Sequence, residues 1–400
     1  MKHTMRWFGP HDPVTLNDIR QAGSQGVVTA LHQIPVGEVW TEEKIRERQQ
    51  MVEAGNERLS PLTWEVVESL PVHEDIKKGR PAREAYIQNY IESLKNLAAC
   101  GIRTVCYNFM PVLDWSRTDV SYVLPDGSRT LRFDVADFAL FDLFILKRAG
   151  AAYEPEIEEE AERRYKAAQP DELRRITDTV LLGLPGSGDK YELDEFARAL
   201  DEYRDLGDRG LRENLYHFVK QIGPAAQEYG INLCIHPDDP PRPLLGLPRV
   251  VSNAIDVTCL LEAFPYRVNG LTFCTGSLGV SPDNDLPEIA EVFAERIHFI
   301  HLRSTQRETN PLNFREAGHL EGDADMYRIV KAIKNEERRR RRAGLPDAEI
   351  PMRPDHGFQM LDDLDKTTYP GYSAIGRLKG LAELRGLEYA IERESSLINI

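Results

Sequence analysis

Four short segments, far apart in the chain, each consist of an apolar run followed by a side chain that can bind a metal. Residues 231–237, 271–276, 297–303 and 350–357 place His236, Cys274, His301 and Asp355 at the ends of these runs. Each run predicts a buried strand. In a barrel of parallel strands, the C-terminal strand ends converge on one mouth. Two imidazoles, a thiol and a carboxylate that meet there are expected to hold one divalent transition metal.

Strand-like and helix-like runs alternate along the chain. The four other strands are expected at residues 6–9, 26–31, 63–68 and 102–108. Helices are expected at residues 16–22, 41–54, 83–99, 214–229, 286–295 and 325–342. Eight such β/α steps predict an α/β fold, a single (β/α)8 TIM barrel with parallel strands over residues 1–400.

One block of the chain is too long for a simple barrel connection. Residues 113–213 lie between the fourth strand and the helix before the fifth. The segment 121–133 carries an Asp126-Gly127 turn that predicts a hairpin, and helices follow, including the acidic residues 154–168. We expect an insertion within the barrel domain, which is either a lid or dimer arm or a decoration without a function.

The composition limits the partners of the chain. A net charge of -15 argues against nucleic acid, because binding to phosphates needs a surplus of Lys and Arg. No apolar stretch reaches the roughly 18 residues of a membrane span, and the first residues do not read as a secretory signal, so a cytoplasmic location is expected.

The five cysteines form no CxxC pair and are expected to be reduced thiols. Without a GxGxxG or P-loop motif no nucleotide is implied. The arginine-rich end of the helix 325–342 is expected to be a solvated helix end.

Position decides which histidine of residues 297–303 is the ligand. His298 lies at the start of the predicted strand and would face the wrong end of the barrel, so His301 is expected to bind the metal. Cys274 has an alternative interpretation, since a buried cysteine often acts as a small apolar side chain. A thiolate favours Fe²⁺, Co²⁺ or Zn²⁺ over Mg²⁺ or Ca²⁺, and Mn²⁺ remains open.

Polar side chains near the expected metal suit an anionic, hydroxylated substrate. Arg303 lies two residues beyond His301 and is expected to hold a carboxylate in a bidentate manner. His356 directly follows the expected ligand Asp355, and Tyr372 lies in a turn after the last strand. An imidazole and a phenol near a divalent metal make a workable base and acid pair. Asp238 or Asp239 is expected to orient a metal ligand by contacting the side of that ligand that faces away from the metal.

At these residues the chain resembles the D-mannonate dehydratase family of the xylose-isomerase-like barrels. The resemblance rests on residues 6–10, 26–32, 101–115, 236–243, 274–277, 301–304, 353–357 and 370–380, and it covers essentially the whole chain. It implies that His236, Cys274, His301 and Asp355 bind the metal, that His356 and Tyr372 are the acid and base, and that Asn108 contacts the substrate.

The resemblance also implies a reaction. The family removes water from D-mannonate to give 2-dehydro-3-deoxy-D-gluconate in hexuronate (glucuronate) catabolism, with Mn²⁺ or Fe²⁺ as the metal. We therefore expect a hydro-lyase that acts on a small sugar acid and forms a homo-oligomer, a dimer or higher. The main alternative is a metal-dependent sugar isomerase or epimerase of the same superfamily. Those sites usually use several carboxylates, whereas the ligand set here has a Cys and one Asp.

Overall fold

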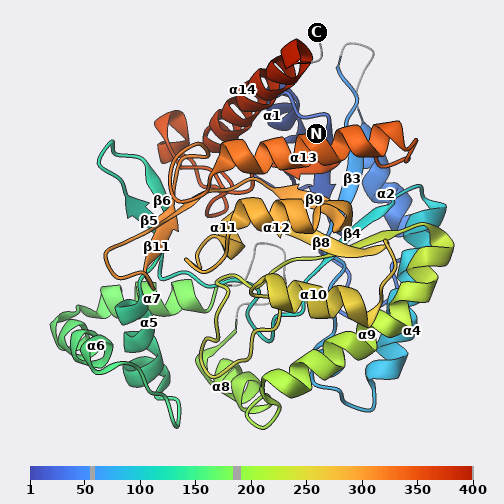
Figure 1. Ribbon diagram of the computed structural model, residues 1–400. Helices are drawn as coiled ribbons and strands as arrows, with labels where there is room; N and C mark the ends of the chain where they lie inside the picture. Colours follow the sequence, from blue (N-terminus) through green and yellow to red (C-terminus); the bar gives the residue numbers. More distant parts are fainter. Residues whose placement is uncertain (55–58, 183–190, 399–400) are drawn as a thin grey trace.

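Eight parallel strands close into a barrel at the centre of the molecule (Figure 1). The computed structural model describes residues 1–54, 59–182 and 191–398. Around the barrel the strands follow one another in the order β1 (Lys2–Arg6), β12 (Pro351–Arg353), β9 (Ile297–His301), β8 (Asn269–Cys274), β7 (Asn232–Ile235), β4 (Thr104–Tyr107), β3 (Thr63–Glu68) and β2 (Gly26–Thr29). The predicted (β/α)8 barrel is confirmed.

Helices surround the barrel (Figure 1), and two of them, at residues 254–263 and 374–398, were not among the predicted helices. The helices that connect or follow the barrel strands are α1 (Leu16–Gln21), α2 (Glu42–Glu53), α4 (Arg83–Ala99), α9 (Gly207–Tyr229), α10 (Ala254–Ala263), α12 (Leu286–Val292), α13 (Met326–Arg342) and α14 (Ala374–Ile398). Neighbouring helices pack side by side, α4 against α9 and α13 against both α12 and α14. In the described ranges, no helix is both long enough and apolar enough to cross a membrane.

Four barrel strands, β2, β4, β8 and β9, are buried at every residue, which fits their mostly apolar sequences. All six residues of β8 are buried. Inside the barrel a small apolar cluster closes the interior, formed by Val28, Val66, Cys106, Cys234 and Phe299. The interior is therefore a packed core, and polar chemistry is confined to the strand ends.

The predicted first strand is wrong. The structure places β1 at Lys2–Arg6 and not at residues 6–9. Thr4 explains the difference, because its hydroxyl is fully buried and donates to the Met352 carbonyl oxygen at 2.9 Å. Gly9 has a φ of 101°, which ends the extended backbone, so residues 7–9 form the loop above the strand. The other strands lie within the predicted segments or begin at most two residues earlier.

A second, smaller sheet joins loops from different barrel strands. The predicted hairpin is present as β5 (Asp119–Val123) and β6 (Arg129–Phe133), with Gly127 at a φ of 84° in the turn. It pairs with a second hairpin that the sequence analysis did not predict, β10 (Thr305–Arg307) and β11 (Phe314–Glu316), which follows β9. The sheet therefore ties the loop after β4 to the loop after β9.

The rest of the insertion is helical. It contains α5 (Val135–Leu140), a π-helical turn (Phe141–Leu146), α6 (Pro155–Ala167), α7 (Pro170–Val180) and α8 (Leu193–Asp201). Figure 1 shows α5, α6 and α7 together at one side of the barrel. Part of the predicted insertion, residues 183–190, lies outside the described residues. Short helices elsewhere are α3 (Glu74–Lys77) and α11 (Thr275–Leu278), with 3-10 turns at Ala294–Arg296 and Leu361–Asp365.

The arginine-rich end of α13 is only partly solvated, so that prediction is wrong in part. Arg340 is 1% exposed and donates to the Ile297 carbonyl oxygen at 2.9 Å and to Glu336 at 2.7 Å. Arg341 and Arg342 are exposed, as predicted. The buried arginine connects the end of α13 to the start of β9.

Candidate metal centre and active site

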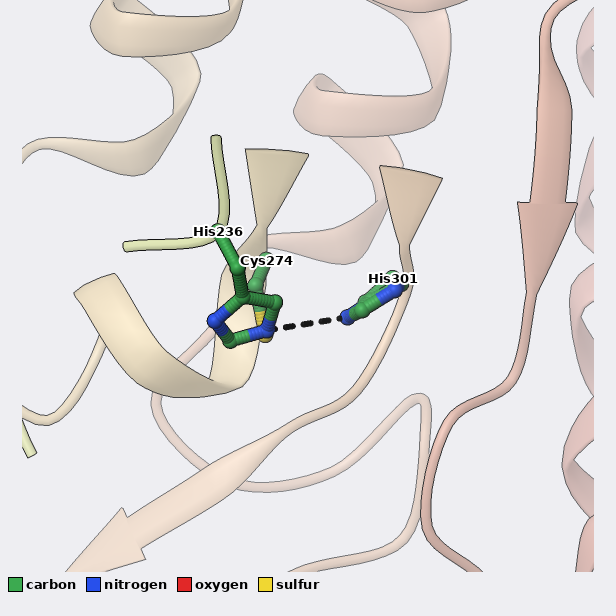
Figure 2. A group of neighbouring side chains, drawn as sticks. All are labelled: His236, Cys274 and His301. Carbon is green, nitrogen blue, oxygen red and sulfur yellow. Dashed lines mark hydrogen bonds between the residues drawn. The ribbon is translucent and has the colours of Figure 1, made fainter. Parts of the chain in front are cut away.

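Three of the four expected metal ligands converge at the C-terminal mouth of the barrel. His236 directly follows β7, Cys274 ends β8 and His301 ends β9, so the three come from neighbouring strands. Their ligand atoms all lie within 4.8 Å of one another. Figure 2 shows the three side chains pointing towards one another, with His236 Nε2 and His301 Nδ1 3.2 Å apart.

The fourth expected ligand, Asp355, lies beside this group. Its Oδ2 is 3.9 Å from the Cys274 sulfur and 3.8 Å from His301 Nδ1. Asp355 follows β12 with a φ of 62°, a left-handed conformation that is uncommon for residues other than Gly and is often found at functional sites. In this conformation the Asp355 carboxylate lies next to the Cys274 and His301 side chains.

The donor set and its spacing fit one divalent transition metal. His nitrogens bind such metals at about 2.0–2.1 Å, and at a tetrahedral angle two of them stand about 3.3 Å apart, close to the observed separation. His236 Nδ1 lies 2.7 Å from the Pro237 carbonyl oxygen, to which it donates its hydrogen. The Nε2 lone pair is therefore left free for a metal.

Glu68, at the end of β3, lies behind His301. Its Oε1 is 3.3 Å from His301 Nε2 and accepts from Arg353 at 2.9 Å. Burial opposes ionisation of Glu68, but Arg353 and its other partners outweigh it and hold the pKa of this carboxyl well below its usual value. Arg353 Nε donates to the same His301 Nε2 at 3.1 Å, so Glu68 and Arg353 compete for this nitrogen. Only the tautomer in which Nε2 donates to Glu68 leaves the Nδ1 lone pair free for a metal.

Arg303 lies at the mouth as predicted, but it is surrounded by carboxylates. Its three nitrogens contact Asp355 Oδ2 at 3.0 Å, Asp239 Oδ2 at 2.9 Å and Glu316 Oε2 at 3.0 Å. Arg117, which is fully buried, contacts Asp239 at 2.9 Å and Glu316 at 3.1 Å from the other side. Arg303, Arg117, Asp239 and Glu316 come from the segments that follow β4, β7 and β9, and they hold one another beside the metal ligands.

Neither aspartate of residues 238–239 contacts His236 through a hydrogen bond. Asp238 accepts from the Val251 backbone and the Ser252 hydroxyl. Asp239 acts through Ser277, whose hydroxyl is 3.2 Å from Asp239 Oδ2 and 3.1 Å from the Cys274 sulfur. The ligand that Asp239 reaches is thus Cys274.

His356 and Tyr372 are neighbours at the same mouth. Their ring centroids are 5.2 Å apart, with the rings nearly perpendicular. His356 Nδ1 lies 3.0 Å from Glu316 Oε1, and the pKa of Glu316 is lowered because Arg303 and its other partners outweigh burial. Burial raises the pKa of Tyr372 to about 12.

One cavity connects these groups. The expected residues that line it are His236, Arg303, Asp355, His356, Tyr372 and Asn108. Arg6, Glu68, Trp115 and Arg353 line it as well, and the sequence analysis did not single them out. By contrast, His298 lies at the opposite end of the barrel, where its Nε2 donates to the Arg267 carbonyl oxygen at 2.7 Å. The geometry thus separates His301 from His298, as predicted.

A signal for some of the missed residues was present in the sequence. Glu68 and Arg353 end barrel strands, so the rule that identified the metal ligands also places these two charges at the mouth. Arg117 lies in the loop after β4 and Glu316 ends β11, and the pairing of β6 with β11 brings their segments together. We find no local sequence signal that predicts this pairing.

A closed parallel barrel with imidazole, thiol and carboxylate groups at its C-terminal mouth is the arrangement of a metal-dependent TIM-barrel enzyme. The comparison with known families specifies the class further. The model of the D-mannonate dehydratase (UxuA) family matches residues 1–397, and the chain belongs to this family of hydro-lyases.

Individual relatives agree with this assignment. The chain is 55% identical over 395 residues to a mannonate dehydratase of Chromohalobacter salexigens, covering 98% of this chain and 99% of that protein. It is 54% identical over 394 residues to that of a Marinomonas species, with 98% and 99% covered. Among solved structures, the mannonate dehydratase of Streptococcus suis serotype 2 superposes with a TM-score of 0.76 at 35% identity, covering 99% of this chain and 95% of the other.

Proposed function

We propose that this chain converts D-mannonate to 2-dehydro-3-deoxy-D-gluconate and water with one divalent metal held by His236, Cys274, His301 and Asp355. The observation that carries the proposal is the convergence of three of these ligands within 4.8 Å, beside the cavity that His356 and Tyr372 line. The metal we propose is Mn²⁺ or Fe²⁺, which a mixed N, S and O ligand set can bind. When bound, it supplies a Lewis acid that stabilises negative charge on the substrate oxygens.

His356 is our proposed base. The proton at C2 of mannonate is weakly acidic, because the neighbouring carboxylate is already anionic, and its removal needs a well-placed acceptor. Glu316 accepts from His356 Nδ1 at 3.0 Å, which fixes the tautomer whose Nε2 carries a free lone pair. This arrangement supports proton abstraction by Nε2.

Tyr372 is our proposed acid. The hydroxyl at C3 is a poor leaving group until it receives a proton. A phenol with a pKa of about 12 keeps its proton at neutral pH and can donate it. When the C2–H bond breaks, its electron pair is first delocalised into the carboxylate as an enediolate. This pair then forms the C2=C3 double bond while the C3–O bond breaks and the leaving oxygen takes the proton of Tyr372, which releases water. The enol then gains a proton at C3 and loses one from its C2 hydroxyl to give the ketone.

The test is incubation of the purified protein with D-mannonate and Mn²⁺ or Fe²⁺, followed by detection of a 2-keto-3-deoxy acid. The proposal requires this product with one water lost per substrate. Formation of an isomeric sugar acid without loss of water would instead support the isomerase or epimerase alternative, which the family match does not favour.

We also propose that Arg303 binds the carboxylate of the substrate. A guanidinium has five N–H groups, and three carboxylates contact one nitrogen each, so N–H groups remain for a substrate oxygen. Arg303→Lys is expected to raise KM for mannonate about 10- to 100-fold at saturating metal, because an ammonium cannot reproduce the planar fork. Steady-state kinetics with parallel metal analysis measure this. An unchanged KM with loss of metal would limit Arg303 to holding Asp355.

Four further expectations from the sequence stay predictions. Asn108 lines the cavity, and its contact with the substrate is part of the proposal. A homo-oligomeric assembly, a role of the insertion as a lid or dimer arm, and a cytoplasmic location remain predictions from the sequence.

A further inference from the structure

A buried hydrogen-bond donor in the active-site cavity has no partner. Trp115 is 2% exposed, and its indole Nε1 has no hydrogen-bond partner among the described residues. The same side chain lines the cavity that contains His236, His356 and Tyr372. A buried N–H without a partner costs free energy, so such groups are rare and call for an explanation.

The indole is held in place by its neighbours. The guanidinium of Arg117 lies over the Trp115 ring, 5.1 Å from its centroid. Arg117 is in turn fixed by its ion pairs with Asp239 and Glu316. A ring held in this way cannot readily turn its N–H towards solvent. Because the side chain lines the cavity, an acceptor that enters there is the partner we consider for this donor.

We propose that the Trp115 indole N–H donates a hydrogen bond to a substrate hydroxyl at C4, C5 or C6, and so selects a polyhydroxylated acid of sufficient length. The inference rests on the proposed function, in which the metal ligands, His356 and Tyr372 all act at carbons C1 to C3 of mannonate. A hydroxyl oxygen has two acceptor lone pairs and matches a donor-only indole. Trp115 thus acts in specificity and not in proton transfer.

The matched experiment compares Trp115→Phe with Trp64→Phe. The first change removes the unpartnered N–H and keeps an aromatic ring beside Arg117. The second removes an N–H that donates to the Val66 carbonyl oxygen at 2.9 Å, outside the cavity. Trp115→Phe is expected to raise KM for mannonate about tenfold with little change in kcat. Trp64→Phe is expected to leave KM unchanged.

Mannonate analogues that lack one hydroxyl at C4, C5 or C6 identify the acceptor. Wild-type protein is expected to bind one of these analogues about tenfold more weakly than it binds mannonate. Trp115→Phe is expected to bind that same analogue as tightly as it binds mannonate, because the hydrogen bond is already lost. Unchanged KM for Trp115→Phe, or equal losses with every analogue in both proteins, would overturn the inference. If Trp115→Phe does not fold, the affinities of wild-type protein for the three analogues provide the test. Equal affinities for the three analogues would contradict the proposed hydrogen bond.

Failure of the inference is distinguishable from failure of the proposed function. Product formation by wild-type protein tests the function alone, since it does not depend on Trp115→Phe. If no product forms, calorimetric binding of mannonate and its deoxy analogues still tests the hydrogen bond. Absence of both turnover and binding would contradict the function and the inference together.

Discussion

Replacement of His356 by Asn, or of Tyr372 by Phe, is expected to lower kcat for mannonate by about 10²- to 10⁴-fold while the metal stays bound. Asn removes the imidazole lone pair proposed to take the C2 proton, and Phe removes only the phenol proton proposed for the leaving hydroxyl. Both side chains line the cavity without being expected metal ligands. Initial rates, together with metal content measured on the same samples, provide the test.

Exchange of the C2 proton with solvent deuterium assigns the two roles. Tyr372→Phe is expected to exchange the C2 proton without eliminating water, since the base remains, whereas His356→Asn is expected to do neither. The reverse result would exchange the two assignments. Wild-type rates in both variants would show that this pair is not catalytic.

The second large effect is expected at the metal ligands. His236→Ala and Asp355→Ala should weaken metal binding by more than about 100-fold, because loss of an outer hydrogen-bond partner alone costs 10- to 100-fold. Activity should fall with metal content. Cys274→Ser should weaken Fe²⁺ or Zn²⁺ binding more than Mn²⁺ binding, since a neutral hydroxyl replaces a thiolate.

His298→Asn is the matched control for the ligand variants. It changes a buried histidine on β9, the strand that carries His301, at the opposite end of the barrel. Metal content and activity should remain those of wild-type protein. Full metal occupancy in both His236→Ala and Asp355→Ala, measured by elemental analysis after gel filtration, would remove these residues from the site.

The barrel, and the expected metal ligands at the C-terminal ends of its strands, could be predicted because both depend on local sequence patterns. The bounds of α4 and β3 equal the predicted ones, and β9 ends at His301 as its apolar run does. Once the strands are parallel, a ligand at each C-terminal end must face the same mouth. The proximity of His236, Cys274 and His301 follows from this rule without knowledge of their contacts.

The charged network around the ligands could not be predicted, because it depends on long-range pairing. Arg117 and Glu316 are 199 residues apart in sequence, and the pairing of β6 with β11 brings their segments together. Charged residues in loops usually remain solvated, so the sequence favours exposure where the structure has full burial of Arg117. The error at Arg340, in the last turn of α13, also comes from a long-range contact, because its burial depends on the Ile297 carbonyl oxygen 43 residues earlier in the sequence.

The central claim is that one metal at this site supports dehydration of mannonate. Metal-free wild-type protein should be titrated with Mn²⁺, and separately with Fe²⁺ under anaerobic conditions, while the rate of 2-keto-3-deoxy acid formation is measured. We predict no activity without metal, then a linear rise that ends at one equivalent per chain. Full activity in the metal-free protein, or a rise that continues to two equivalents, would contradict this account.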